Sequence, residues 1–425
     1  MRKSLLAVAA LMGASVLPAQ AISFKVSEDV QGNMGFKAQI WGQYLGERTS
    51  GNKSATDFRL RNVRLYANGN VGKYMYFFSN MDFTPTSANA TDAGIGLKFM
   101  DELRIQAGLY RTPFSRAALT DSYTYLVPTG YFYGGLAVDA PLQGPTTYRN
   151  AGLTVWGDIA DAMIKYYIGV FDGQYNNGTN RWGKDNLMYT VRLQFTPTML
   201  GFKGEKGYGL RDTRLGRQNV LSFGVGYATQ KCSPASASST TYTSISSPSA
   251  SIFCGTSQPI SPGTPTLSFT TKAWTVDAKH EQKFGDFIAN WEAAYFDVKD
   301  VNVYQIGSNI YKDDRKGYYI QVGAIYDQVV GIGKPGIALR YDYAEHKYAT
   351  PRSYTDPDTS VTRQISKDKY KRWGVGFNYF LKGQDAMIQL AVDRVDVPNY
   401  KSSANNVTVK QKDYTDVTLA FQVQF

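Results

Sequence analysis

The sequence predicts an all-β fold, a transmembrane antiparallel β-barrel of 16 strands with one loop folded into the lumen. The C-terminal segment 413–425 alternates apolar and polar residues and ends on Phe425, so its side chains fall on two opposite faces. Beyond the N-terminus, no window holds the roughly 18 uncharged apolar residues of a membrane helix. Mean hydropathy is −0.33, with 31 Tyr and 40 Gly. Connections between strand-like segments also alternate in length, as in outer-membrane barrels.

Residues 1–21 are expected to form a cleaved signal peptide. Arg2 and Lys3 precede a short apolar stretch, and Ala-Gln-Ala at 19–21 is a small-x-small cleavage site. The alternative is an N-terminal membrane helix, but the apolar stretch is short and no positively charged stop follows it. The mature barrel is therefore expected to span 22–425 and to reside in a bacterial outer membrane.

Sixteen segments show strand character, and most approach the roughly 9–11 residues that a tilted membrane strand needs. The expected strands are 35–46, 56–68, 73–84, 94–100, 102–111, 148–157, 162–173, 186–196, 218–230, 270–283, 287–298, 316–327, 336–348, 370–381, 385–396 and 413–425.

Tight links alternate with long polar segments along the chain. An even strand number puts both termini on the side of the tight turns, which is the periplasmic side in outer-membrane barrels. One connection, 197–217, is long although it falls on the short-turn side. The long segments expected outside are 47–55, 85–93, 112–147, 174–185, 231–269, 299–315, 349–369 and 397–412.

The strand faces favour a barrel with a wet interior. A lipid-facing Lys or Arg at the midplane costs about 2–4 kcal/mol, so basic strand residues should point inward. Arg192, Lys279, Arg340 and Arg372 lie opposite the apolar faces of their strands. The alternative is a soluble β-sandwich or β-helix, which should show continuous inward apolar faces and no alternation of loop length.

The segment 112–147 is the candidate constriction loop. It is rich in aromatic and small residues, and Arg116 is its single basic residue. An external loop has no need of so much apolar surface, so we expect it to fold into the lumen and narrow the channel that sixteen strands leave open. The alternative is packing on the outer rim or at a subunit contact.

Arginines near this loop are the candidate anion-binding residues, because guanidinium is always charged and its planar donors suit phosphate and carboxylate. Arg59 and Arg61 share a face and Arg64 falls on the other, so a β-bulge at Asn62-Val63 is expected to turn all three inward. The alternative is that the arginines pair with wall acids and only solvate the lumen. The candidate set is Arg59, Arg61, Arg64, Arg104, Arg111, Arg116, Arg149, Arg192 and Arg340.

The segment 231–269 is dominated by Ser, Thr and Pro, which predicts an exposed loop. Cys232 and Cys254 are expected to form a disulfide worth roughly 3 kcal/mol; two free thiols are the alternative. Two Cys and two His leave little for a metal site, and no cofactor is expected. Lys and Arg are scattered rather than arranged in a stripe, so no nucleic-acid partner is expected.

Three segments resemble the phosphate-selective porin O and P family. These are FRLRNVRLYAN at 58–68, LRIQAGLYRTPFSR at 103–116 and YRNAGL at 148–153. The resemblance implies a trimeric sixteen-stranded porin whose pore is lined with Arg and Lys. The chain departs from the family's basic constriction, since 112–147 carries Arg116 alone.

The expected function is passive diffusion of small anions across the outer membrane, with phosphate as the leading candidate. Basic residues would replace part of the anion's hydration, and weak successive sites would let it leave. The alternatives are a general nonselective porin, a carbohydrate-permeable porin and an outer-membrane barrel enzyme. No catalytic constellation stands out, so we expect a channel and not an enzyme. The expected partners are small anions such as phosphate, outer-membrane lipid and further copies in a homotrimer.

Overall fold

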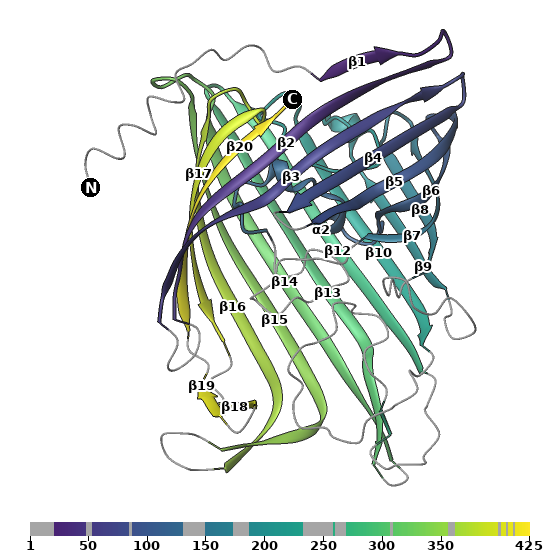
Figure 1. Cartoon of the computed structure of the whole chain (residues 1–425). Helices are drawn as coiled ribbons and strands as arrows, with labels where there is room; N and C mark the ends of the chain where they lie inside the picture. The colour runs from purple at the N-terminus through teal and green to yellow at the C-terminus, as the bar shows by residue number, and fades with distance from the viewer. Residues whose placement is uncertain are drawn as a thin grey trace.

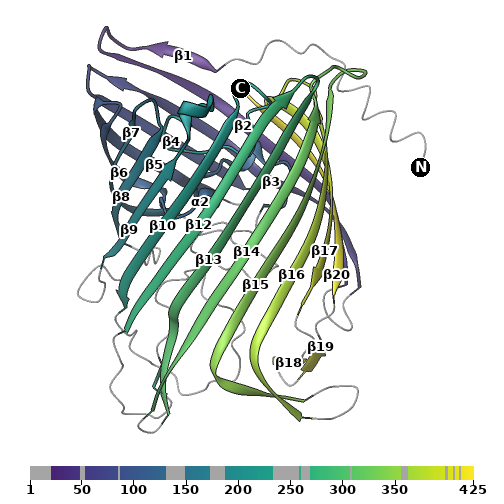
Figure 2. The same cartoon turned by 180° about the vertical axis from the view of Figure 1, so that it is seen from behind.

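A computed structural model gives the fold of the chain (Figures 1 and 2). The structure describes residues 21–47, 53–84, 87–130, 149–172, 187–232, 258–259, 269–306, 309–355, 362–397, 401–404, 407–410 and 413–425. The predicted signal peptide, the second part of the predicted constriction loop (131–147) and most of the Ser/Thr-rich loop lie outside these residues. So does the predicted disulfide, because Cys254 is not described.

Sixteen antiparallel strands close into one barrel, as the sequence predicts. They are β2 (Val30–Leu45), β3 (Ala55–Val71), β4 (Met75–Thr84), β5 (Ser87–Met100), β6 (Leu103–Arg111), β7 (Arg149–Ile159), β8 (Ile164–Phe171), β9 (Met188–Phe195), β10 (Val220–Cys232), β12 (Phe269–Phe284), β13 (Phe287–Ile306), β14 (Asn309–Tyr326), β15 (Lys334–Thr355), β16 (Thr362–Phe380), β17 (Ala386–Asp396) and β20 (Tyr414–Gln424). Each overlaps one predicted segment.

The barrel closes between its first and last strands. Lys37 of β2 faces Gln424 of β20, and Phe36 and Phe425 exchange two backbone hydrogen bonds of 2.9 Å. The short strand β1 (Ile22–Lys25) pairs with the part of β2 that extends past Phe425. Both edges of β2 are therefore covered, which leaves no open sheet edge at the seam.

Strand β9 shows that apolar side chains face outward from the barrel. Tyr189 and Leu193 are 53% and 49% exposed on its outer face, whereas Thr190 and Arg192 are 1% and 0% exposed on its inner face. A soluble sandwich would bury the apolar side instead. The alternation thus excludes the sandwich alternative and gives the outer surface the apolar band that lipid requires.

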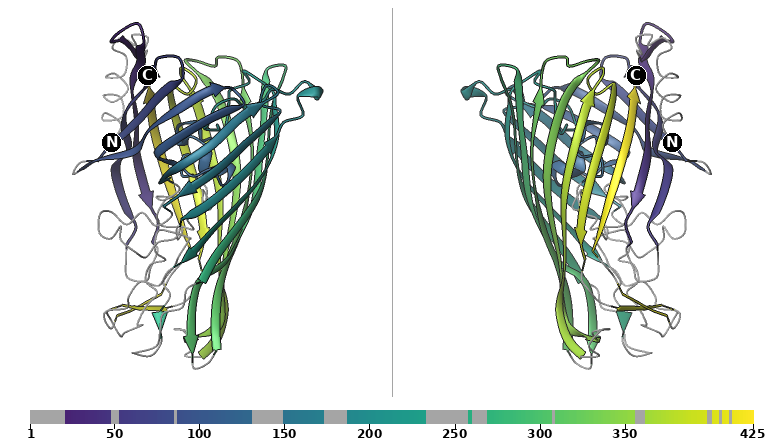
Figure 3. Two further views of the ribbon diagram at one scale, coloured as in Figure 1. Left: turned by 90° about the vertical axis from the view of Figure 1, so that its right-hand side faces the viewer. Right: turned by 90° about the vertical axis from the view of Figure 1, so that its left-hand side faces the viewer.

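The strands differ greatly in length around the barrel. β8 and β9 have 8 residues each, whereas β13 and β15 have 20 and 22. The long strands continue well beyond the rim at the end opposite the tight turns (Figure 3). The minor elements are β11 (Gln258–Pro259), β18 (Lys401–Ala404), β19 (Val407–Lys410), α2 (Arg116–Leu119), η1 (Ser122–Thr124) and η2 (Thr198–Leu200).

Among the described residues, two connections enter the interior. The inner segment 112–130 follows β6 and carries α2 and η1, and α2 lies inside the barrel in both views (Figures 1 and 2). The turn-side segment 196–219 joins β9 to β10 and contacts the inner segment. Among the described residues, no helix has the length and apolar character to cross a membrane.

Candidate functional site

The inner segment is held against one side of the barrel by its own caps and by the wall. Ser115 caps α2 by accepting a hydrogen bond from the Ala118 amide, and Asp121 caps η1. Inward side chains of four strands donate to the segment's carbonyls: Gln422 of β20 to Tyr123 (2.9 Å), Gln389 of β17 to Tyr125 (2.8 Å), Asn378 of β16 to Leu126 (3.0 Å) and Arg340 of β15 to Val127 (3.4 Å). These bonds satisfy a backbone that would otherwise be buried without partners.

The turn-side segment continues this internal structure. The Asp121 amide donates to the Leu210 carbonyl and the Leu210 amide donates to the Leu119 carbonyl, both at 3.0 Å. The Leu126 amide donates to the Asp212 carboxylate at 2.8 Å. The connection that breaks the loop-length alternation is therefore long because it enters the barrel and meets the inner segment.

A buried charge cluster fixes the two segments to each other and to the wall. Arg116 of α2 contacts Glu205 of the turn-side segment at 2.6 Å and Glu292 of β13 at 3.0 Å, and all three side chains are at most 1% exposed. Burial alone would raise the pKa of the Glu205 carboxyl, but the charge of Arg116 and its hydrogen bonds hold that pKa well below the usual value. The carboxylate is thus charged and paired in the folded protein.

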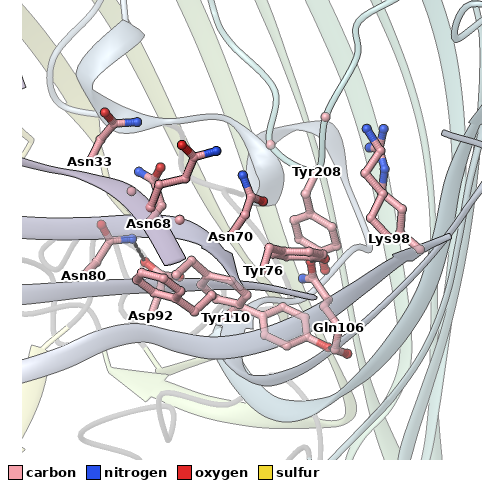
Figure 4. Close-up of a pocket in the computed structure, with 18 of the residues that line it drawn as sticks. Asn33, Asn68, Asn70, Tyr76, Asn80, Asp92, Lys98, Gln106, Tyr110 and Tyr208 are labelled. Atoms are coloured by element: carbon pink, nitrogen blue, oxygen red, sulfur yellow. Dashed lines mark hydrogen bonds between the residues drawn. The ribbon is translucent and has the colours of Figure 1, made fainter. Parts of the chain in front are cut away.

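These contacts divide the lumen into two halves. We call the inner and turn-side segments, together with the inner faces of β8–β17 and β20, the packed half. The inner faces of β1–β7 form the open half. A cavity of about 1090 Å³ lies in the open half, lined mainly by β1–β6 and by Gly207, Tyr208 and Gly209 of the turn-side segment (Figure 4).

A cluster of cations surrounds one carboxylate at the boundary between the halves. Lys37 Nζ lies 3.1 Å from Asp121 Oδ2, and Arg111 Nη2 lies 3.5 Å from Asp121 Oδ1. Burial would raise the pKa of Asp121, but Lys37 and Arg111 hold it well below its usual range. Arg64 lies over the Tyr123 ring at 5.8 Å and forms two hydrogen bonds with Asp82. This cation cluster (Lys37, Arg64 and Arg111) lines the cavity.

A bulge is present on β3, one residue before the predicted position at Asn62-Val63. The pairing with β2 shifts between Asn62 and Leu60, which leaves Arg61 as the extra residue. Arg59 and Arg61 both lie over the inward Trp41 ring, with guanidinium-to-centroid distances of 5.6 and 5.2 Å. The structure thus brings Arg59, Arg61 and Arg64 to the inner face, in order from the loop end toward the cation cluster.

Two more predicted arginines lie on the open half, each with a carboxylate partner. Arg104 lines the cavity, stacks on Trp156 at 4.4 Å and binds Asp101 at 2.6 Å and Asp158 at 3.2 Å. Arg149 makes a bidentate contact with Asp92 at 2.9 and 3.1 Å. The pairing with wall acids that the sequence left as an alternative is therefore common on this wall.

Arg116, Arg192 and Arg340, also predicted to line the pore, lie away from the cavity. Arg192 contacts Asp277 at 2.6 Å and Arg340 contacts Asp342 at 3.0 Å, and both are fully buried in the packed half with Arg116. The strand alternation places them inward correctly. It cannot show that two connections fill that side of the lumen.

Two residues of this site were not predicted from the sequence: Lys37 of the cation cluster and its partner Asp121. Lys37 shares a face with Gln39 and Gln43, and this alternation could have identified it. Asp121 belongs to a loop, where no periodicity marks its position. The contact between them spans 84 residues and is set by the path of the inner segment.

Comparisons with known proteins agree with the barrel architecture. The anion-selective porin of Comamonas acidovorans has a TM-score of 0.52 to this chain at 12% identity, with 93% of this chain and 100% of that chain covered. The outer-membrane expressed OmpT of Vibrio cholerae has a TM-score of 0.50 at 12% identity, with 95% and 100% covered. The fold is that of the outer-membrane porins.

Similarity in sequence to known proteins is low. An uncharacterized protein of Aquifex aeolicus is 24% identical over 323 residues, which is 74% of this chain. The chain spans 64% of the length of that curated relative. No family model matches the chain.

Proposed function

We propose that this protein is a porin of the bacterial outer membrane that favours the passage of small anions, with phosphate as the leading candidate. The observation that carries the proposal is the cation cluster. Lys37 of β2 and Arg111 of β6 contact Asp121 on the wall of the cavity, and Arg64 of β3 lies beside them over the Tyr123 ring. The shared fold with a porin named as anion-selective agrees with this proposal.

Charge at the cavity wall supports a preference for anions over cations. Six basic residues and two acidic residues line the cavity. Asp82, Asp101 and Asp158 pair with lining arginines from nearby positions and reduce the excess. One charge pair at 4 Å is worth about 1 kcal/mol in water and about 4 kcal/mol at an effective dielectric of 20. Partly neutralised cations therefore provide weak sites that an anion can enter and leave.

The proposed path uses the inner face of β3. Anions would meet Arg59 and Arg61 near the loop end and then the cation cluster on the wall of the cavity. Arg104 and Arg111 would act within the cavity, and Arg149 would orient Asp92. We also propose that the mature chain is exported through cleavage of residues 1–21, sits in outer-membrane lipid and assembles as a homotrimer.

The test is single-channel recording of the purified full-length protein in a planar bilayer with a salt gradient. We expect the reversal potential to show that anions permeate better than cations. We also expect added phosphate to reduce the chloride current. A reversal potential near zero would support a nonselective porin. A preference for cations without any effect of phosphate would contradict the proposal.

The variant Arg64→Gln sharpens this test, because it removes one charge from the cation cluster and keeps a polar side chain. We expect a smaller anion preference for this variant. The matched control is Arg394→Gln on β17, because Arg394 is half exposed and lies outside the cavity. Equal effects of the two substitutions would show that the cation cluster does not set selectivity.

A further inference from the structure

Side-chain amides line the mouth of the cavity at the turn side, and one of them, Asn33, accepts a hydrogen bond from Ser23 Oγ at 2.9 Å. Gln31 of β2 faces Asn70 of β3, and Asn33 faces Asn68, as direct cross-strand partners. All four lie on the cavity wall, where Figure 4 shows Asn33, Asn68 and Asn70 side by side. Within the described part of the chain, the structure gives Gln31, Asn68 and Asn70 no side-chain hydrogen bond. Their donors and acceptors therefore face the cavity's water.

Beside these amides, two aromatic rings lie along the wall. Tyr76 and Phe78 of β4 are neighbours on one face of the strand, with centroids 6.4 Å apart and planes at 30°. Each ring covers a glycine of β5: a Cβ on Gly96 would collide with the Tyr76 ring, and a Cβ on Gly94 would lie 2.6 Å from Phe78 Cζ. The glycines thus let the rings lie flat against the sheet. The flat Tyr76 ring can present its π surface to the lumen, and Phe78 also packs edge to face with Tyr110, with centroids 6.0 Å apart.

Cross-strand pairing places the rings next to the amides. Asn70 faces Tyr76, and Asn68 faces Phe78, across the β3–β4 ladder. Tyr76 Oη donates to Gln106 Oε1 at 3.2 Å, which fixes the ring's position. The result is one continuous surface of hydrogen-bonding groups and aromatic faces, which we call the amide–aromatic wall (Gln31, Asn33, Asn68, Asn70, Tyr76 and Phe78).

Cations lie at both ends of this wall. The cation cluster lies at the deep end. Lys25 lies at the mouth, opposite Gln31 in the pairing of β1 with β2. Lys98 and Arg104 face each other across β5 and β6, and Arg104 stacks on Trp156. A ligand lying on the wall is therefore within a positive environment along its length.

We propose that this wall binds acidic sugars, that is, hydroxylated rings that carry a carboxylate. Amides donate to and accept from hydroxyl groups, aromatic faces stack on the apolar face of a sugar ring, and Lys and Arg bind the carboxylate. Inorganic phosphate would use the cations alone and would leave the amides and rings without a role. The inference rests on the proposed function and extends it, because it adds a second class of anion, one that would contact the amides and rings as well as the cations.

The test compares ligands on the full-length protein in planar bilayers. Galacturonate, glucose and acetate are added in turn, and the concentration that halves the single-channel current is measured. We expect galacturonate to act at a concentration about tenfold lower than glucose or acetate, equivalent to about 1.4 kcal/mol. Equal block by galacturonate and acetate would overturn the role of the wall, and equal block by galacturonate and glucose would overturn the role of the cations.

Variants locate the effect. Tyr76→Ala and the double variant Asn68→Ala/Asn70→Ala should each weaken galacturonate block several-fold and leave the reversal potential unchanged. Tyr76→Phe keeps the ring and should retain most of the block, so it distinguishes lost stacking from a misfolded barrel. Tyr74→Ala is the matched control, because Tyr74 packs against Phe99 and does not line the cavity.

The two proposals fail in different ways. Anion-selective current without preferential galacturonate block would overturn the inference and leave the proposed function intact. Absence of any channel current from folded protein would overturn the proposed function, and the inference with it.

Discussion

The two halves of the lumen use the same residue type in opposite ways. In the packed half, Arg116 is 0% exposed and binds two carboxylates that are equally buried. In the open half, Arg59 is exposed, and Arg111 reaches Asp121 at the edge of the cavity. A buried arginine fixes two segments in place, whereas an exposed arginine on the open half faces the lumen. The surroundings of the guanidinium, not its presence on an inner face, decide its role.

The packed half should depend strongly on Arg116. The substitution Arg116→Ala removes the shortest ion pair of both buried carboxylates and leaves Glu205 with Arg214 at 3.5 Å and Glu292 with Lys279 at 3.6 Å. Breaking a buried pair in this way costs about 3–5 kcal/mol. We expect the free energy of unfolding in urea, followed by Trp fluorescence of the refolded barrel, to fall by this amount. The control Arg394→Ala removes an exposed pair and should change it by about 0–1 kcal/mol. Equal losses would show that the cluster does not hold the packed half.

Acid should loosen the packed half through Glu205. Because the pKa of Glu205 is lower in the folded protein than the unfolded value of about 4.3, its stabilisation is fully present at neutral pH. It is lost as pH falls below about 5 and through the lower folded pKa. We expect the unfolding free energy of the wild type to decline in this window. Glu205→Gln should lower stability at pH 7 and flatten the decline; an unchanged slope would contradict the assignment.

In the open half, Asp121 should limit the anion preference. Asp121→Asn removes the negative charge between Lys37 and Arg111, and one charge at about 4 Å is worth about 1 kcal/mol in water, or about fivefold. We therefore expect the anion-to-cation permeability ratio to rise about fivefold, measured from the reversal potential in a salt gradient. The control Asp396→Asn removes a half-exposed charge outside the cavity and should have a smaller effect. A fall in the ratio for Asp121→Asn would contradict the role of the cation cluster.

The smallest effect is expected at the loop end of the proposed path. Arg61→Gln removes a half-buried charge that lies over Trp41. The screening length is about 10 Å at 0.1 M salt and about 3 Å at 1 M. We expect the anion-to-cation permeability ratio, obtained from the reversal potential, to change by less than about twofold at 0.1 M salt. At 1 M salt we expect no change. A change in permeability ratio that persists at 1 M salt would contradict this, because it would mean that salt does not screen Arg61 from the passing ions.

The barrel itself could be predicted because its determinants are local. Alternation within 187–195 identifies an outer and an inner face, and the spacing of turns identifies strand number. The bulge at Arg61 could also be predicted, since the cost of placing a charge in lipid outweighs the loss of one ladder position. The candidate site was only partly predictable. The sequence identifies Arg116 as inward but cannot distinguish a residue that faces water from one that faces Glu205, which lies 89 positions away.

The sequence by itself determined the strands, their two faces, the closure by the C-terminal strand and the abundance of inward arginines. Each of these follows from periodicity and from the cost of charge in lipid, which act over a few residues. Only the tertiary structure decided which half of the lumen is open. That depends on the meeting of the segments 112–130 and 196–219, whose hydrogen bonds and ion pairs join parts of the chain that no local pattern connects.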